Sequence, residues 1–389
     1  MIVGEPEQLP VFDVRVTDED IEAVEAALRS GWLTMGERTE RFEREFAASI
    51  GSARGVALAS CTAALHLACM AADVGPGDEV IVPSVTFAAT ANAVRYTGAV
   101  PVFADVVSEH DLGIDVDHVE ALIGERTKAV IPVHYAGYAV EIDRLAELCE
   151  RRGLALIEDS AHAPSASQHP GGPRLGSIGV AGCFSFFPNK VLGVGEGGAL
   201  VTDDDAFADR IVRLRSQGMT AVSIDRHRGK AIGYDVLERG YNYRFDDPRA
   251  ALLLSRFHRL EAELVERRAA VARYRELLAD APGLSVPYAD FDLDCSSCYL
   301  MGVLASDPAT RRALRERLSQ VHGVQTTMYP AVHLFTAYVE AYGEVSLPVT
   351  ERVTDGLFSI PLYPHITVAQ QERVAEALYE SLEFAGAGR

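Results

Sequence analysis

The sequence predicts an α/β protein with a mostly parallel sheet, followed by a smaller α+β domain. Between residues 56 and 157, short apolar or β-branched runs alternate with helical patterns of about ten to twelve residues, which is typical of a parallel sheet covered by helices on both faces. After residue 250 a long Arg- and Ala-rich helical pattern replaces this alternation. A chain of 389 residues is also too long for one compact core. We therefore expect a large domain at residues 1–250 and a smaller one at residues 251–389.

The chain begins with two predicted helices. Thr17 and Asp20 form a capping-box pattern ahead of apolar residues at helical spacing, and Gly31 ends this pattern. Phe42 and Phe46 lie four residues apart and so share one face of the next helix. The alternating region then predicts strands at residues 56–58, 79–82, 100–104, 129–133 and 154–157, and helices at residues 63–72, 87–96 and 142–152.

Polar residues follow three of these strands. In open sheets of this kind, ligands bind beyond the carboxyl ends of the strands. Residues 61–62, 83–87 and 158–162 are therefore expected along one edge of the sheet, where they face the same crevice.

The C-terminal region has a different texture. Residues 252–278 read as one long helix, which we expect to lead into the second domain. A strand at residues 298–304 and helices at residues 309–320 and 368–382 follow, which is an α+β arrangement.

Charge and composition exclude several classes of protein. A net charge of −20 argues against nonspecific binding to nucleic acid or anionic membranes. No apolar run approaches the roughly 18 to 20 residues of a membrane span. The start of the chain lacks a basic segment followed by a long apolar one, so no signal peptide is expected. Cys295 and Cys298 form a single C-x-x-C without a second pair, so we expect no metal site and a reduced, cytoplasmic protein.

Lys190 lies at the centre of the segment that we expect to carry the chemistry. An apolar run ends at Phe187 before it, and four glycines follow within residues 193–198. Of the 36 Lys and Arg residues only three are lysines, at positions 128, 190 and 230. A lysine in an apolar site has a lowered pKa and can form an imine with a carbonyl, which arginine cannot do. The alternative is a lysine whose side chain reaches from a strand end to solvent.

Asp159 is the second candidate, because it follows the apolar strand at residues 154–157. A buried carboxylate needs a cationic partner, although Asp159 could instead cap a helix. Together with Lys190 it meets the minimal requirement for pyridoxal phosphate (PLP), whose pyridinium nitrogen a carboxylate keeps protonated. Residues 60–62, at the start of a helix, offer backbone N–H groups and hydroxyls for the phosphate. Ser185 could add another hydroxyl, although each of these residues also suits a simple cap or core position.

Other motifs are absent or do not fit their context. The glycines at residues 193–198 match G-x-G-x-x-G, but a strand-like run at residues 199–202 follows instead of a helix, so we reject a dinucleotide site. The sequence contains no P-loop, H-E-x-x-H or G-x-S-x-G motif. The basic cluster at residues 226–230 is either a solvated loop or a contact for substrate phosphates.

Nine segments together resemble the DegT/DnrJ/EryC1/StrS family of PLP-dependent aminotransferases, which act on keto sugars. They follow the family's order over nearly the whole chain. The segments are residues 32–36 (WLTMG), 60–67 (SCTAALHL), 83–90 (PSVTFAAT), 133–137 (VHYAG), 158–162 (EDSAH), 184–190 (FSFFPNK), 195–198 (GEGG), 240–244 (GYNYR) and 359–364 (SIPLYP).

The resemblance implies a fold type I, aspartate aminotransferase-like architecture and a homodimer with active sites at the subunit interface. It implies that Lys190 is the Schiff-base lysine and that Asp159 is the partner of the pyridine nitrogen. It also implies that Phe87 stacks on the cofactor ring and that His162 lies near the phenolic oxygen. Thr62 and Ser185 would bind the phosphate, in a loop that includes Cys61. The neighbouring subunit would contribute Asn242.

Two residues depart from the family pattern. Cys61 stands where glycine is common, which should narrow the phosphate loop, and His162 replaces the more usual glutamine. A histidine there makes the protonation state of this position a variable. A dehydratase branch of the family has histidine in place of the lysine, so the presence of Lys190 favours transamination.

The expected function is transfer of an amino group from L-glutamate or L-glutamine to a keto sugar, most simply a nucleotide-linked keto-deoxysugar, in amino-sugar or antibiotic biosynthesis. Substrate contacts are expected from Arg228, Tyr329 and His333, in loops that pattern analysis does not resolve. The alternatives are a keto-cyclitol aminotransferase, a non-catalytic PLP- or sugar-binding sensor of the same fold, and an NAD-dependent oxidoreductase.

Overall fold

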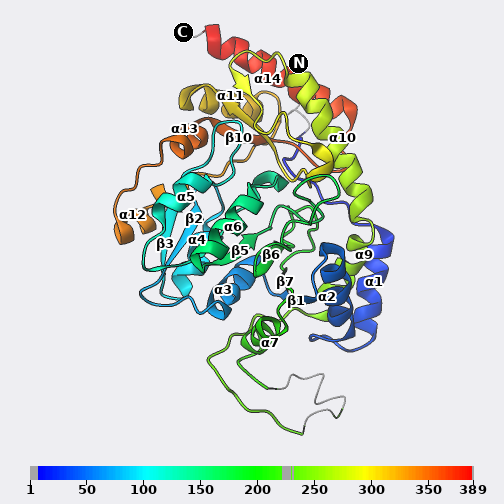
Figure 1. Cartoon of the computed structure of the whole chain (residues 1–389). Helices are drawn as coiled ribbons and strands as arrows, with labels where there is room; N and C mark the ends of the chain where they lie inside the picture. Colours follow the sequence, from blue (N-terminus) through cyan, green and yellow to red (C-terminus); the bar gives the residue numbers. More distant parts are fainter. Residues whose placement is uncertain (1–7, 221–228, 230–231, 388–389) are drawn as a thin grey trace.

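The computed structural model describes residues 8–220, 229 and 232–387. A seven-stranded sheet lies in the lower part of Figure 1 between two groups of helices, and the C-terminal helices α11, α13 and α14 gather above it. The prediction of an α/β fold with a mostly parallel sheet is confirmed.

The seven-stranded sheet has the order β1-β7-β6-β5-β4-β2-β3. The pairs from β3 through β6 are parallel, whereas β7 pairs antiparallel with both β1 and β6. The strands are β1 Arg54–Leu58, β2 Glu79–Pro83, β3 Val100–Ala104, β4 Thr127–Val130, β5 Ala155–Asp159, β6 Ala181–Ser185 and β7 Gly198–Thr202. Several predicted ends were wrong, among them the carboxyl ends of two strands. β4 stops at Val130 because Val133 makes only an isolated bridge with Asp159, and β5 continues to Asp159 through its pairing with β6.

Helices cover the sheet, and their starts follow local signals. Thr17 and Asp20 form the expected capping box of the first helix, and Ser60 caps α3 through a bond from the Ala63 N–H. The helices of this region are α1 Asp18–Arg29, α2 Glu37–Ile50, α3 Cys61–Ala71, α4 Ala88–Tyr96, α5 Val116–Leu122, α6 Ile142–Arg152 and α7 Asp205–Leu214.

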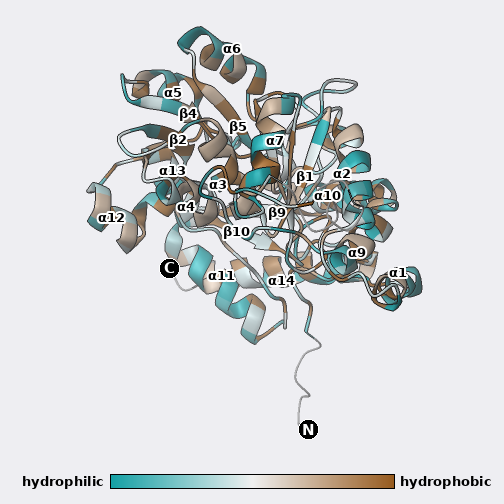
Figure 2. Cartoon of the chain, turned by 90° about the horizontal axis from the view of Figure 1, so that it is seen from below, coloured by the Kyte–Doolittle hydropathy of each residue, from teal (hydrophilic) through white to brown (hydrophobic). Residues whose placement is uncertain are grey.

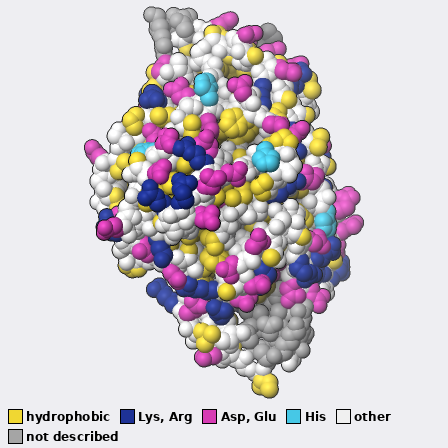
Figure 3. Space-filling view, viewed as in Figure 1, with side chains coloured by type: hydrophobic (Ala, Val, Ile, Leu, Met, Phe, Trp, Pro, Cys, Tyr) yellow, Lys and Arg dark blue, Asp and Glu magenta, His cyan; other side chains and the backbone are white. Residues whose placement is uncertain are grey.

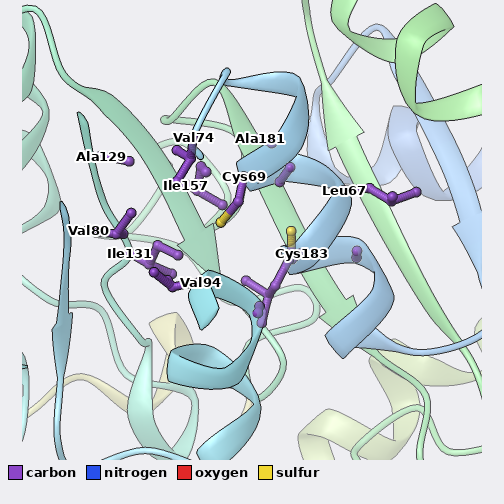
Figure 4. Close-up of a cluster of buried hydrophobic side chains, with 14 of the residues drawn as sticks. Leu67, Cys69, Val74, Val80, Val94, Ala129, Ile131, Ile157, Ala181 and Cys183 are labelled. Carbon is purple, nitrogen blue, oxygen red and sulfur yellow. The ribbon is translucent and has the colours of Figure 1, made fainter. Parts of the chain in front are cut away.

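The apolar core beside α3 fixes the position of the site. Eight of the eleven residues of α3 are buried, which is why this helix reads as apolar on every side. Figure 4 shows Cys69 of α3 among side chains of β2, β4, β5 and β6, whereas Leu67 points away from them. Burial of this helix holds its N-terminus at the carboxyl edge of the sheet.

One expected helix was wrong. The pattern at residues 252–278 forms two helices, α9 Asp247–Phe257 and α10 Leu260–Leu278. Arg259 leaves helical geometry (φ −111°, ψ 5°), and its guanidinium donates to the buried carboxylate of Asp20 in α1 at 2.7 Å. This contact joins residues that are far apart in sequence, and it holds the chain at the point where α9 ends and α10 begins. The expected boundary at residue 250 lies within α9, and the division into two domains stays a prediction.

The C-terminal region contains a three-stranded antiparallel sheet of order β10-β9-β8. The strand predicted at residues 298–304 starts later, at Met301. The elements are β8 Leu284–Ser285, β9 Met301–Ala305, β10 Leu357–Ile360, α11 Pro308–Gln320, α12 Thr336–Tyr342, α13 Pro348–Gly356 and α14 Val368–Ala387.

Hydrophilic residues lie on the outer helices, as α11 shows in Figure 2. On the face drawn in Figure 3, acidic and basic side chains are interspersed. Within the described ranges, no helix combines the length and apolar character that crossing a membrane requires.

Candidate active site

A cavity of about 310 Å³ opens where the carboxyl end of β5, the turn after β6 and the start of α3 meet. This is the edge of the sheet at which the sequence predicts a ligand site. Eight of the expected site residues line it: Cys61, Thr62, Phe87, Asp159, His162, Ser185, Lys190 and Tyr329.

Lys190 reaches this cavity from a tight turn after β6, in which its backbone N–H donates to the Phe187 carbonyl at 2.9 Å. Its Nζ lies 4.5 Å from the ring centroid of Tyr299. Burial lowers the pKa of Lys190 to about 8, and the nearby Asp159 acts in the opposite direction. The lowered pKa increases the fraction of Lys190 that is a neutral, nucleophilic amine near neutral pH.

Asp159 ends β5 and is only 5% exposed. One carboxylate oxygen accepts from the Thr90 hydroxyl at 2.8 Å and the other accepts from the Ala161 N–H at 3.2 Å. Burial raises the pKa of Asp159, while these two bonds and Lys190 lower it. A cation brought against this carboxylate from the cavity would lower its pKa and favour its charged form. Because Asp159 completes a strand, and the residues after it form turns, it is not the cap of a helix.

The preceding residue, Glu158, has different hydrogen-bond partners and does not face the cavity. It is fully buried and accepts from the N–H groups of Gly176, Ile178 and Gly179 at 2.7–2.8 Å, and its Oε2 lies 3.0 Å from His134 Nε2. Neighbouring residues of a strand point to opposite sides. Glu158 therefore holds a loop, and Asp159 faces the cavity.

The start of α3 forms an anion cradle. The N–H groups of the first helical turn lack intrahelical acceptors, and Ser60 uses its hydroxyl to cap Ala63 at 3.1 Å. Cys61 and Thr62 thus present backbone N–H groups and the Thr62 hydroxyl to the cavity, close to Ser185. Gly198 of β7 lies directly behind, where a Cβ would overlap the Cys61 nitrogen. The close approach of β7 to α3 therefore requires glycine here.

The structure settles the tautomer of His162. Its Nδ1 accepts from the Ala136 N–H at 3.3 Å, so the ring proton is on Nε2. Ala136 presents this N–H from a left-handed conformation, with φ of 56°. Burial lowers the pKa of His162 well below its usual value, and Lys190 lowers it further. Both observations favour a neutral His162 that donates through Nε2, whereas the sequence left its protonation state open.

His162→Gln is expected to leave the pH profile unchanged between pH 6 and pH 8. A lowered pKa keeps His162 neutral over this range, and a glutamine can also accept from Ala136 and donate into the cavity. The measurement is a pH titration of cofactor absorbance and turnover in both proteins. An inflection near pH 6–7 that is present in the wild type and absent from the variant would contradict the neutral assignment.

Aromatic rings form one wall of the cavity. Phe87 occupies the N-cap position of α4 and is 62% exposed, and its ring centroid lies 6.5 Å from that of Tyr329. Tyr329 in turn contacts the rings of Tyr135 and His162 at 5.9 Å. This wall can stack against a planar ring bound in the cavity.

Two expected residues, His333 and Asn242, do not line the cavity in this chain. His333 is 2% exposed and its Nδ1 lies 2.7 Å from the Ser84 hydroxyl, so it fixes the loop after β2 instead of reaching a substrate in the cavity. Asn242 accepts from Arg244 at 2.9 Å, away from the cavity. Arg228 lies outside the described residues.

Sequence analysis did not single out Thr90, Glu196 or Tyr299. Thr90 lies four residues after Thr86, and their hydroxyl oxygens are 2.7 Å apart. Because residues four apart share one face of a helix, this spacing could have indicated that Thr90 also lies near the site. Glu196 lines the cavity from the glycine-rich segment. Tyr299 comes from the C-terminal region, and no local signal connects it to Lys190. Within the described residues, no group of three or more His, Cys, Asp or Glu side chains could hold a metal ion.

Sequence comparisons match the chain to one family of known proteins. The sequence profile of the DegT/DnrJ/EryC1/StrS aminotransferase family matches residues 14–379. Spore coat polysaccharide biosynthesis protein SpsC of Bacillus subtilis is 36% identical over 98% of this chain and 97% of its own length.

Two solved structures show the same fold. The aminotransferase TlmJ from Streptoalloteichus hindustanus is 34% identical, with a TM-score of 0.89 over 97% of this chain and 100% of the other. NtdA from Bacillus subtilis, with bound cofactor PMP, is 26% identical, with a TM-score of 0.84 over 95% of this chain and 83% of the other.

Proposed function

The chain belongs to the DegT/DnrJ/EryC1/StrS aminotransferase family, and we propose that it is a PLP-dependent aminotransferase that transfers an amino group from L-glutamate or L-glutamine to a keto sugar. One observation carries this proposal: an amine of lowered pKa, a buried carboxylate and an anion cradle line the same cavity.

The residues that line the cavity match the chemical groups of PLP. The start of α3, with Thr62 and Ser185, suits a phosphate. Asp159 needs a cation, which a protonated pyridine nitrogen provides. The exposed ring of Phe87 suits a stacked heterocycle. A relative with PMP bound in the same fold supports this assignment.

When bound, PLP supplies a carbonyl that condenses with amines and a ring that accepts the electrons of a deprotonated carbon. Lys190 supplies the amine that anchors the cofactor and, once released, moves the proton between the substrate carbon and the cofactor carbon. Asp159 holds the proton at the pyridine nitrogen. His162 donates Nε2–H toward the phenolic oxygen, and the ring proton stays on Nε2 because Nδ1 is occupied.

A second copy of the chain completes the site in this proposal. No arginine occurs among the described residues that line the cavity, although a dicarboxylate donor requires cationic partners. Phe87 is 62% exposed at the cavity mouth, and Asn242 lies on the surface. We infer a homodimer in which the neighbouring subunit contributes Asn242 and the cation for the donor.

The acceptor is proposed to be a keto sugar, most simply a nucleotide-linked keto-deoxysugar used in amino-sugar or antibiotic biosynthesis. SpsC, a polysaccharide biosynthesis protein by name, supports a sugar over other ketones. A keto-cyclitol is the alternative acceptor, and a non-catalytic sensor is the alternative role. A cytoplasmic location is part of the same proposal and is supported by six free cysteines.

The proposal predicts a visible absorption band with PLP that L-glutamate or L-glutamine bleaches. A keto acceptor should then restore the band, because it takes the amino group away. Nucleotide-linked keto sugars and keto-cyclitols are compared as acceptors in the same cuvette, with D-glutamate as the control donor. A band that no amino donor bleaches would contradict transamination and favour the sensor.

A further inference from the structure

Tyr299 is a buried residue of the C-terminal region that lies against the reactive lysine. Its side chain is 0% exposed, and Lys190 Nζ is 4.5 Å from its ring centroid. An ammonium within about 6 Å of an aromatic centroid is attracted to the electron-rich ring face. The attraction is stronger where the cation is desolvated.

Contacts on several sides fix this ring. Phe12 stacks on it at 5.8 Å with an interplanar angle of 13°, and the His162 ring lies 4.2 Å away. The Tyr299 hydroxyl lies 3.4 Å from that of Tyr329, and its backbone N–H donates to the Ala136 carbonyl at 2.9 Å. The ring is therefore a rigid surface beneath Lys190.

The titratable neighbours of Lys190 are Asp159 and the Cys61 thiol, whose charged forms would raise its pKa, and His162, whose own pKa Lys190 lowers. Asp159 favours the ammonium, whereas burial disfavours it. His162 is neutral, and burial raises the pKa of the Cys61 thiol well above its usual value, so it too is neutral. In the proposed function the charge of Asp159 is committed to the pyridine nitrogen. The face of Tyr299 then remains to hold the ammonium.

We propose that Tyr299 is a positioning residue, whose ring face holds the Lys190 ammonium whenever the lysine carries a proton and keeps its Nζ directed into the cavity. The role in turnover rests on the proposed function. The contact itself can be tested without it.

The three-lysine composition makes a direct test possible. Reductive methylation of the full-length, cofactor-free protein with ¹³C-formaldehyde gives lysine signals that Lys128→Arg and Lys230→Arg assign. The ¹³C shift of Lys190 against pH then reports its pKa in each variant. Tyr299→Phe keeps the ring face, and Tyr299→3,4,5-trifluorophenylalanine keeps the shape but weakens the electron-rich face.

The pKa of Lys190 should stay near the wild-type value in Tyr299→Phe. It should fall by roughly half a pH unit or more in the fluorinated protein, because the ammonium loses its attraction to the ring. The same fluorinated residue at Tyr135, which packs against His162 and Tyr329, is the control and should leave Lys190 unchanged.

Equal Lys190 pKa values in the Phe and trifluorophenylalanine proteins would overturn the proposal, as would an equal shift in the Tyr135 control. Circular dichroism confirms that each variant is folded, and the near-isosteric fluorinated ring avoids a cavity. If the Lys190 pKa values are equal but glutamate still bleaches the visible band, the contact is rejected and the proposed aminotransferase activity stands. If the pKa of Lys190 falls as expected but no amino donor bleaches the band, the aminotransferase activity is rejected and the contact stands.

Discussion

Replacing Lys190 by arginine is expected to abolish aminotransferase turnover, with a loss of roughly 10³-fold or more, because in the proposed function this one side chain is both nucleophile and proton carrier. A guanidinium keeps the positive charge beside Asp159 and can lie over the Tyr299 ring, so the fold should tolerate it. It stays protonated at all working pH values, however, and can neither form an imine nor accept a proton.

The measurement is turnover with L-glutamate together with the visible spectrum after addition of PLP. Lys190→Arg should bind the cofactor weakly and show no glutamate-dependent change in the visible band. Lys128→Arg makes the same substitution at an exposed position of β4 and should behave as the wild type. Retained turnover in Lys190→Arg would remove the lysine from the mechanism.

Asp159→Asn is expected to weaken cofactor binding by roughly 100-fold or more, since it removes one partner of a buried, hydrogen-bonded charge pair. The asparagine keeps the size of the side chain and can accept from Thr90 or Ala161, but it cannot balance a proton on the pyridine nitrogen. Turnover should fall further than binding, because the same charge is needed while the substrate carbon loses its proton.

Thr90 offers a graded control for this prediction. Thr90→Val removes the hydroxyl that donates to Asp159 at 2.8 Å and should raise the pKa of the carboxyl, since that bond favours its charged form. Cofactor affinity should then fall at lower pH first, as the carboxyl takes up a proton. Thr90→Ser keeps the hydroxyl and should follow the wild-type curve.

The Asp159 prediction fails if the wild type and Asp159→Asn bind the cofactor equally well, because Asp159 would then not contact the cofactor.

Local patterns predicted most of the elements and most of the residues of the candidate site. The capping box at Thr17, the alternation of strands and helices, and the apolar run before Lys190 depend on neighbours within a few residues, which a sequence displays directly. The carboxyl ends of adjacent parallel strands meet at one edge, so the position of Asp159 after an apolar strand was enough to place it beside the start of α3.

The features that only the tertiary structure decided depend on contacts between segments far apart in the chain. Arg259 separates two helices and binds Asp20, and no periodicity shows that contact. The N–H of Ala136 fixes the tautomer of His162, although histidine alone permits either. Tyr299 reaches Lys190 across more than one hundred residues. The sequence by itself thus determined which chemistry the chain can perform. The packing of distant segments decided how each reactive group is charged and held, because burial and neighbouring dipoles set a pKa and these arise only in the folded chain.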